Sequence, residues 1–425
     1  MKLNFNNQKV GYYFFCLGII LLPSAPSIAG LFFLISIIIS IIFSKNKFFA
    51  DKWNFLLILS TFLIFISCIF NNFYNPTLNN IDKENYTIWL NIFNWIPFFV
   101  AFWSFQPYLD SNIKRGLFSK LLIIGSIPVF VSCILQKWFN VYGPLDTLNG
   151  LIIWYQKPLN GTNGVSGLFS NPNYTSFWLS VILPFSLSQL SLQKNLSIKY
   201  FLNLSLAIFI IYLTISTNSR SGLLSIFNSI YLVLGAKYIF YLLLLFALFI
   251  PFYILLIRFD IEFIKEILPL KLINKLTRFD ILNFRNYSRI NIYLDTIKLI
   301  AKNPIFGLGG GTFAIVFPFF SQIKGIQHAH NLPLQIAYDF GILTSITLTG
   351  FVFFLFTKSF KKVFIKYGDK SNIINKAWIC STLVCIAFNL TDIPYYDFRV
   401  SIVSWILLSG IRSILRENLN IKKSV

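Results

Sequence analysis

The sequence predicts an all-α protein that crosses a membrane many times. Of its 425 residues, 56% are hydrophobic and only 12% are charged. A soluble domain cannot bury that much apolar surface, whereas the hydrocarbon core of a bilayer accepts it. Long apolar runs also recur along nearly the whole chain. This is the pattern of helices that cross a hydrocarbon layer of about 30 Å.

We expect about 12 transmembrane helices. The first two should form a hairpin that turns at Pro23 and Pro26. A cleaved signal peptide is the alternative, but its removal would invert the charge pattern downstream. The expected spans are at about residues 11–23, 27–43, 54–70, 87–105, 117–135, 174–192, 200–217, 221–236, 238–257, 333–356, 377–391 and 400–415.

The formal net charge of +21 indicates membrane topology rather than a nucleic-acid partner. With the N-terminus inside, most of the 36 Lys and Arg residues fall in cytoplasmic segments, as the positive-inside rule requires. Both termini are then cytoplasmic. Residues 1–257 hold nine spans, residues 258–332 form one long outer (periplasmic) segment, and residues 333–425 hold three spans and a cytoplasmic tail.

Two outer segments interrupt the short connections between spans. Residues 139–173 are rich in Gly, Asn and Pro, a turn-forming composition that predicts an ordered or semi-ordered loop. The long segment contains amphipathic stretches at about 260–277 and 287–302 and then the glycine-rich "NPIFGLGGGTF". No Lys-Ser/Thr pair follows these glycines, so we interpret them as a close backbone approach rather than a phosphate loop.

The cysteines do not form a recognisable site in the sequence. All five, Cys16, Cys68, Cys133, Cys380 and Cys385, fall within expected spans. We interpret them as small buried apolar residues, because neither a disulfide framework nor metal-ligand spacing is present.

Two arginines are candidates for binding an anion. Arg220 in "NSRSG" lies at the outer end of a span, where an arginine is costly unless it is paired or lines a wet cavity. An interfacial anchor that reaches the headgroups is the alternative. Arg289 in "NYSRINIYLDTIKLI" lies on an amphipathic helix, and an ordinary solvated charge is its alternative.

The two histidines of the chain both fall in "GIQHAHNLPLQIAYDFGILTSI", at His328 and His330. A neutral imidazole can accept a proton from a hydroxyl nucleophile. A hydrogen-bonded interfacial pair is the other interpretation. A zinc site is a weaker interpretation, since no nearby Cys or Glu supplies a third ligand at a sensible spacing.

Taken in order, "TNSRSGLLS", "SRINIYLDTIKLIAKNPIFGLGGGTF" and "HAHNLPLQIAYDFGILTSI" resemble the core of the O-antigen ligase and O-antigen polymerase superfamily of bacterial membrane glycosyltransferases. Upstream, "SGLFSNPNYTSFWLSVILP" is similar to that superfamily's outer loop, and the resemblance covers about residues 160–350. It implies a GT-C-like membrane architecture and a metal-independent, nucleotide-independent enzyme without a cofactor. It also implies a polyprenyl-diphosphate-linked glycan as donor, such as undecaprenyl diphosphate carries in lipopolysaccharide biosynthesis, and a lipid A-core or similar acceptor at the periplasmic face of the inner membrane.

The resemblance also assigns residues. Arg220 and Arg289 match the arginines that hold the donor diphosphate, and His330 matches the histidine near the acceptor. We expect His330, rather than His328, to be catalytic, because it directly precedes Asn331 at the start of a helix. A helix N-terminus tends to keep an imidazole neutral, and Asn331 can cap that helix. The remaining candidates for substrate binding are His328, Asn331, Asn171 and Asn173.

Near the C-terminus, "DIPYYDFRVSIVSW" resembles a pattern in a subset of relatives from photosynthetic bacteria, some of which are described as involved in inorganic-carbon accumulation. The roles of its Asp392, Asp397 and Arg399 stay open. A ligase is the leading hypothesis, and an O-antigen polymerase is its alternative. Another alternative is a transport-related protein for a small anion such as bicarbonate. Transporters, however, place charges deep in broken helices, whereas the unusual residues of this chain gather at the outer face. A membrane scaffold would leave the arginines and histidines unexplained.

Overall fold

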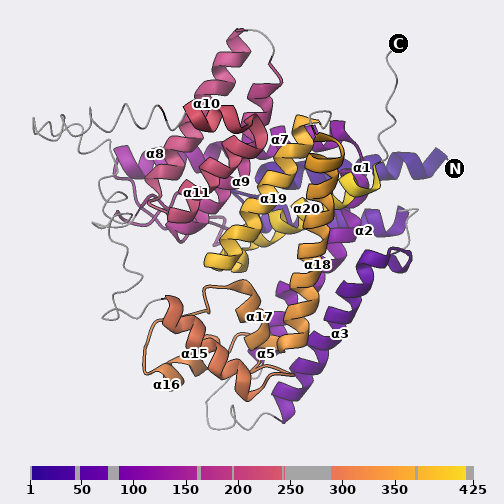
Figure 1. Cartoon of the computed structure of the whole chain (residues 1–425), viewed down its shortest axis with the longest axis vertical. Coiled ribbons are helices and arrows are strands. Elements are labelled where there is room, and N and C mark those ends of the chain that lie inside the picture. The colour runs from indigo at the N-terminus through magenta and orange to yellow at the C-terminus, as the bar shows by residue number, and fades with distance from the viewer. Residues whose placement is uncertain are drawn as a thin grey trace, which may run out of the picture.

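The computed structural model describes residues 2–43, 48–74, 86–159, 164–193, 196–241, 244, 289–368 and 372–417 (Figure 1). These residues form an α-helical bundle with one short hairpin. The N-terminal half contains α1 (Lys2–Leu21), α2 (Pro26–Phe43), η1 (Phe48–Ala50), α3 (Lys52–Phe73), α5 (Tyr86–Leu90), η2 (Asn91–Asn94), α6 (Ile96–Ser104), η3 (Gln106–Tyr108), α7 (Asn112–Gly125), α8 (Ile127–Trp138), β1 (Leu145–Thr147), β2 (Ile152–Trp154) and α9 (Pro172–Ser191).

The second half holds the segments that build the polar site. Figure 1 shows α15, α16 and α17 together at the lower end of the view, below α19. The elements are α10 (Ile198–Ser216), α11 (Arg220–Ser229), η4 (Ile230–Leu234), α15 (Arg289–Lys302), α16 (Phe313–Ser321), α17 (Leu332–Phe340), α18 (Ile342–Phe360), η5 (Lys361–Lys366), α19 (Ile373–Thr391), η7 (Pro394–Tyr396) and α20 (Phe398–Arg416).

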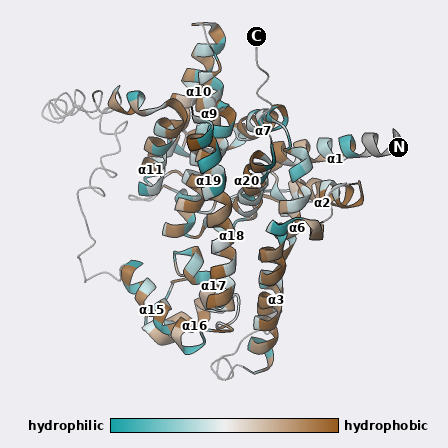
Figure 2. Cartoon of the chain, turned by 45° about the vertical axis from the view of Figure 1, so that its right-hand side comes forward, coloured by the Kyte–Doolittle hydropathy of each residue, from teal (hydrophilic) through white to brown (hydrophobic). Residues whose placement is uncertain are grey.

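Among the described residues, eight helical segments are long and apolar enough to cross a membrane, and two shorter apolar helices, Gln8–Leu21 and Arg220–Leu234, coincide with further expected spans. Figure 2 shows α3 as almost uniformly hydrophobic, whereas α15 carries both hydrophobic and hydrophilic residues, as expected for an amphipathic helix. The prediction of an all-α polytopic membrane protein is thus confirmed. The expected span at 238–257 and the amphipathic stretch at 260–277 lie largely outside the described residues.

Three helices form the interior of the bundle. α9 contacts α7, α10, α11 and α19, and most of its residues are buried. Small side chains make this close packing possible: the α-carbon of Gly222 faces Ser176, whose hydroxyl would lie 2.2 Å from an added Cβ. α19 and α20 are also largely buried. Their loops therefore lie at fixed positions at the two ends of the bundle.

The expected single span at 333–356 is wrong. The helix breaks at Gly341, which has a φ of 90° and separates α17 from α18. A Cβ at Gly341 would lie 1.9 Å from the carbonyl oxygen of Ile305, so only glycine fits this close approach. The hydroxyl of Ser345 donates to the carbonyl of Pro333 at 2.7 Å. α17 therefore folds back against the first turns of α18, and the long apolar helix begins at Ile342.

The glycine-rich loop after α15 packs against this break. The backbone N–H groups of Leu308 and Gly309 donate to the carbonyls of Tyr338 and Asp339, at 2.7 and 3.1 Å. These bonds satisfy carbonyls that have no partner at the end of a helix. Gly307 also approaches this backbone, since an added Cβ would meet the Tyr338 carbonyl at 2.5 Å. The interpretation of these glycines as a close approach is confirmed.

The loop from 139 to 173 is ordered in its described parts. β1 and β2 pair as an antiparallel hairpin, and the indole N–H of Trp154 donates to the carbonyl of Ser24 at 2.9 Å. The buried Gln136 side chain accepts from the N–H groups of Ser166 and Gly167, at 3.0 and 2.9 Å. These contacts fasten the loop to the α1–α2 turn and to α8. The five cysteines are free, and all but Cys16 are buried, as expected.

Candidate functional site

The histidine loop before α17 is held in one conformation by three hydrogen bonds. His330 has a φ of 52°, in the left-handed region that costs a non-glycine residue on the order of 1 kcal/mol. Its carbonyl accepts from the Tyr293 hydroxyl at 3.1 Å, and its N–H donates to Nδ1 of His328 at 3.3 Å. The N–H of Ala329 donates to Gln335 at 2.8 Å. Strained backbone that its surroundings enforce in this way is typical of functional sites.

Asn331 completes this loop as the cap of α17. Its side-chain oxygen accepts from the N–H of Leu334 at 3.0 Å, and its side-chain nitrogen donates to the Leu390 carbonyl at 3.0 Å. The prediction that Asn331 caps a helix beginning at Leu332 is confirmed. The second bond ties the histidine loop to the end of α19, close to Asp392.

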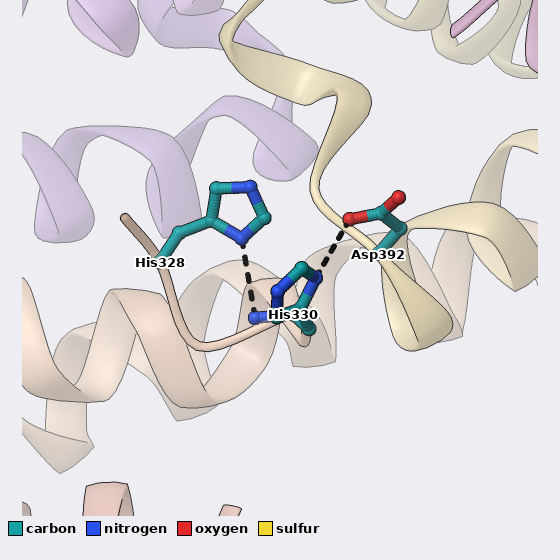
Figure 3. Close-up of side chains that lie close together, drawn as sticks. All are labelled: His328, His330 and Asp392. Carbon is teal, nitrogen blue, oxygen red and sulfur yellow. Dashed lines mark hydrogen bonds and ion pairs between the residues drawn. The ribbon is translucent and has the colours of Figure 1, made fainter. Parts of the chain in front are cut away.

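Asp392, directly after α19, is the partner of His330 (Figure 3). Nδ1 of His330 lies 3.0 Å from Oδ1 of Asp392. The same oxygen accepts from the N–H of Ile393 at 2.9 Å, while Oδ2 accepts from Nδ2 of Asn173 at 2.8 Å. Both carboxylate oxygens are thus hydrogen-bonded, and the aspartate side chain is only 7% exposed.

The charges around Asp392 keep it ionised. Burial alone would raise its pKa, but the hydrogen bond and charge of His330, the charge of Arg289 and the Ile393 N–H together lower the pKa to about 2. Because an ionised carboxylate only accepts hydrogen bonds, Nδ1 of His330 must be the donor. The lone pair of a neutral His330 ring then lies on Nε2, and this side chain is 26% exposed.

His328 has a different environment from its neighbour. Its ring lies 4.3 Å from that of His330 between centroids, at 68°. Burial, followed by the charge of His330, lowers the pKa of His328 to about 4, so this ring is neutral near pH 7. Its Nδ1 accepts from the chain rather than facing a carboxylate. The ring therefore supports the loop.

The two arginines lie at helix starts near this pair. Arg289 begins α15, one turn before Tyr293, and its charge lowers the pKa of both His328 and Asp392. Arg220 begins α11, and the hydroxyl of the next residue, Ser221, lies 3.1 Å from that of Thr391. Both arginines are exposed. Neither forms an ion pair with another described residue.

The asparagines predicted to bind substrate have structural contacts in the described part of the chain. Asn171 caps α9 by accepting from the N–H of Asn173 at 2.8 Å, and Asn173 donates to Asp392. Asn331 caps α17. In this structure, therefore, the three amides position the loops that carry the histidine and the aspartate. A direct role in substrate binding stays a prediction.

Asp392 also supplies the third ligand that the sequence analysis lacked. One atom each of His328, His330 and Asp392 lies within 4.8 Å of the others, a set that can hold a metal ion. Two of these atoms are nevertheless joined by the His330–Asp392 hydrogen bond, and Nδ1 of His328 accepts from the backbone. These bonds use Nδ1 of both histidines and Oδ1 of Asp392, and they leave Nε2 of His330 able to bind a further group.

Sequence reasoning missed Asp392 as a site residue, although it noted the motif. The aspartate lies 62 residues from His330, and only the packing of α19 beside the histidine loop reveals the pairing. One signal was present: an aspartate immediately after an apolar span, at the same end of the bundle as the histidines. Acidic residues are rare at such positions without a partner.

These features define a class: a polytopic α-helical membrane protein whose polar site is built at helix ends. Residues 205–349 match the family model described as O-antigen ligase. This match agrees, for the segment that it covers, with the resemblance to the O-antigen ligase and polymerase superfamily that the motifs predict. The segment contains Arg220, Arg289 and both histidines but ends before Asp392. No curated protein sequence matches the chain significantly.

Proposed function

We propose that the protein is an O-antigen ligase-like glycosyltransferase. It moves a glycan from a polyprenyl diphosphate onto a lipid A-core or similar acceptor, without a metal or a nucleotide. The observation that carries this proposal is the hydrogen-bonded pair of His330 and Asp392, with the exposed Arg289 close enough to shift the pKa of Asp392. A base and a cation side by side are what glycosyl transfer from a diphosphate needs.

In this mechanism His330 is the general base. Asp392 holds the Nδ1 proton, so Nε2 faces the acceptor hydroxyl with its lone pair. The hydroxyl gives its proton to Nε2 while its oxygen forms a bond to the anomeric carbon of the donor glycan. The bond from that carbon to the diphosphate oxygen breaks, and its electron pair leaves with the diphosphate.

The arginines act on the leaving group. Negative charge grows on the diphosphate as the glycosidic bond breaks, and guanidinium groups can bind its oxygens in bidentate fashion. Arg220 and Arg289 are exposed at the starts of α11 and α15. Their charge would supply the stabilisation that a metal ion gives in other phosphate-using enzymes.

An apolar groove beside the pair supports a lipid-linked donor. This groove has a volume of about 420 Å³ and is lined by α17, α18, α19 and α20. Leu332 and Leu390 line the end next to Asn331. Most of the other lining side chains are aliphatic or aromatic, including Val352 and Phe356, and a few are Thr, Ser or Asn. A polyprenyl chain in this groove would bring its diphosphate to the level of His330.

The charge distribution supports one orientation of this site in the membrane. We propose that it faces the periplasm of a bacterial inner membrane, with both termini in the cytoplasm. In a cysteine-free background, a cysteine at Lys157 should react with an impermeant maleimide added outside, and a cysteine at Lys361 should not. The opposite pattern contradicts this orientation.

Reconstituted protein tests the function directly. Purified protein in lipid nanodiscs is mixed with the lipid-diphosphate-linked glycan and the glycolipid acceptor from host cells that lack the gene. Transfer of the whole glycan to the acceptor supports a ligase, whereas growth of the glycan on its own lipid identifies a polymerase. Absence of both reactions, with bicarbonate uptake by proteoliposomes, would replace the proposal with anion transport.

A further inference from the structure

A second cavity lies at the same end of the bundle and has a different character. Its volume is about 460 Å³, within the range of about 300–1,000 Å³ that small-molecule sites occupy. Its walls come from the β1–β2 hairpin, the start of α2, the start of α9 and the η7–α20 turn. We call it the hairpin cavity.

The hairpin cavity is lined by groups that combine rings with hydroxyls. The phenol rings of Tyr155, Tyr174 and Tyr396 and the hydroxyls of Ser27 and Ser170 all contribute. A saccharide presents both apolar C–H faces and hydroxyls, so it fits such a lining better than a purely apolar or purely charged ligand. Within the described part of the chain, the hydroxyls of Tyr155, Ser27 and Ser170 form no hydrogen bond, and they are available to a ligand.

The charged residues of the cavity are already neutralised. Asp397 binds Arg399 through two hydrogen bonds, of 2.8 Å from Nε and 2.5 Å from the terminal nitrogen. The guanidinium of Arg399 also lies 4.0 Å from the ring centre of Phe169, and the residue is only 4% exposed. A closed ion pair offers little to a phosphate or a cation. The lining therefore favours a neutral polar ligand.

The cavity shares a wall with the catalytic pair. The Tyr174 hydroxyl donates to the carbonyl of Ile393 at 3.5 Å, and the preceding Asn173 donates to Asp392. These contacts place the α9 end of the cavity against the residues that hold the carboxylate.

A hydrogen-bond chain connects the other wall to the histidine loop. The Tyr396 hydroxyl donates to Oδ2 of Asp339 at 3.2 Å, and Nε2 of Gln335 donates to Oδ1 of Asp339 at 2.9 Å. Gln335 in turn accepts from the N–H of Ala329, between the two histidines. The phenol that lines the cavity and the catalytic loop are therefore positioned by one network.

The rim of the cavity is preformed. The hairpin is fastened to the α1–α2 turn by Trp154, and the N–H of Tyr155 donates to the Leu168 carbonyl at 3.3 Å. A binding wall that is ordered before the ligand arrives loses less entropy on binding. Tyr155 thus presents its ring from a fixed backbone, although the residue itself is 39% exposed.

We infer that the hairpin cavity binds a sugar of the acceptor glycan and presents one of its hydroxyls to His330. This inference rests on the proposed function, and it adds the acceptor subsite, for which the sequence has no recognisable motif. The apolar groove lies on the Leu332 and Leu390 side of the pair. The donor lipid and the acceptor sugar would then approach the reacting atoms from different sides.

Binding of the acceptor glycan tests this inference without catalysis. The probe is the oligosaccharide released by mild acid from the acceptor glycolipid of host cells that lack the gene, labelled with a fluorophore. Its binding to protein in nanodiscs is followed by fluorescence anisotropy. Tyr155→Ala removes the ring and the hydroxyl and should weaken binding roughly 10-fold or more. Tyr155→Phe keeps the ring and should weaken it about 2- to 10-fold.

The matched control is Tyr142→Ala, which removes a tyrosine of the same loop whose hydroxyl bonds Asn140 outside the cavity. It should leave binding unchanged. His330→Ala should also keep glycan binding while it loses transfer, so failure of the proposed function is separable from failure of the subsite.

Three results would overturn the inference, in addition to an unchanged acceptor KM in Tyr155→Ala. They are absence of glycan binding by the wild-type protein, equal binding by Tyr155→Ala and wild type, and a Tyr155→Ala defect in the KM of the donor alone. The last outcome would assign the cavity to the donor glycan. Transfer that persists with unchanged acceptor KM in Tyr155→Ala would leave the glycosyltransferase standing and remove the subsite.

Discussion

Buried charged residues lie at both ends of α20. The two ends differ in how many hydrogen-bonding groups of these residues remain without a partner. At the C-terminal end, Asp51 accepts from Arg412 at 3.0 Å and from Arg416 at 2.5 Å. Although burial alone would raise the pKa of Asp51, these arginines hold it below its usual value. Arg115 is fully buried and bonds Glu417, the Asn375 side chain and the Leu109 carbonyl. We call these residues the charge cluster.

The N-terminal end of α20 lies near the catalytic pair, where hydrogen-bonding capacity remains. His330 uses Nδ1 but keeps Nε2, and Arg220 and Arg289 are exposed. The comparison teaches that a buried charge alone does not identify a functional site in a membrane protein. A closed set of ion pairs fixes helices in place, whereas a partly satisfied set can still bind a ligand.

The largest expected effect is on catalysis at the site. His330→Ala should lower transfer by about 10² to 10⁴ while the melting temperature stays close to wild type, because the general base is lost and the fold is not. Asp392→Asn should lower it similarly, since an amide can donate to Nδ1 and fix the wrong tautomer. Rates are measured in nanodiscs with both substrates. His328→Ala is the control and should lose far less; equal losses in both histidine variants would contradict a unique base.

At the charge cluster the expected effect is on stability. Arg115→Ala removes a fully buried side chain with its bonds to Glu417, Asn375 and Leu109 and leaves a cavity, so it should lower the free energy of unfolding by about 2–5 kcal/mol. The specific activity of the folded fraction should stay unchanged. Lys114→Ala is the matched control, because its pair with Asp110 is exposed and such pairs contribute only about 0–1 kcal/mol. If folded Arg115→Ala loses specific activity, the charge cluster is not purely structural, and the contrast between the two ends of α20 is contradicted.

A smaller effect is expected where charge is kept and geometry is changed. Arg220→Lys and Arg289→Lys should each lower kcat/KM for the donor about 10- to 100-fold, because an ammonium cannot reproduce the planar guanidinium fork. Steady-state kinetics with the lipid-diphosphate donor measures this. Lys298→Ala, on the exposed side of α15 in a pair with Asp295, is the control. Wild-type kinetics in both arginine variants would remove the diphosphate assignment.

Zinc should inhibit rather than activate. EDTA treatment is expected to leave transfer unchanged, since the histidines and Asp392 bond one another. Zn²⁺ in the micromolar range should compete for His328, His330 and Asp392 and lower the rate several-fold. Asp392→Ala should weaken zinc binding, measured by calorimetry. Loss of activity in EDTA that Zn²⁺ restores would make the three residues a catalytic metal site.

The local parts of this structure could be predicted from the sequence. The cap at Asn331 and the amphipathic helix at Arg289–Lys302 each depend on neighbouring residues. Hydrophobic runs likewise gave most spans, because a bilayer imposes their length. Such features need no knowledge of what packs against them.

What could not be predicted depends on contacts across the chain. The break at Gly341 occurs inside an apolar run, and its reason is the carbonyl of Ile305, which no local pattern reveals. Asp392 becomes the partner of His330 only because α19 ends beside the histidine loop. The sequence also does not distinguish a cap from a ligand contact at the asparagines, because both need the same polar side chain at the same helix start, and their role in substrate binding stays a prediction.

The smallest expected effect concerns the pH dependence of stability at His328. Burial and the charge of His330 lower its pKa from 6.5 to about 4. The unfolded chain therefore takes up a proton at this residue as the pH falls below about 6.5, while the folded protein takes it up only near 4, so stability falls across this window. Asp392, whose pKa is lowered from 3.8 to about 2, loses its contribution only below pH 3.8. Between pH 7.5 and 5.0, a difference in melting-temperature loss between the wild type and His328→Gln therefore reports on His328. His330 is present in both proteins and contributes equally. The wild type should lose about 1–3 °C more than His328→Gln between these values. An equal loss in both proteins would mean that His328 is not held neutral, and the contrast between the two histidines would rest on geometry alone.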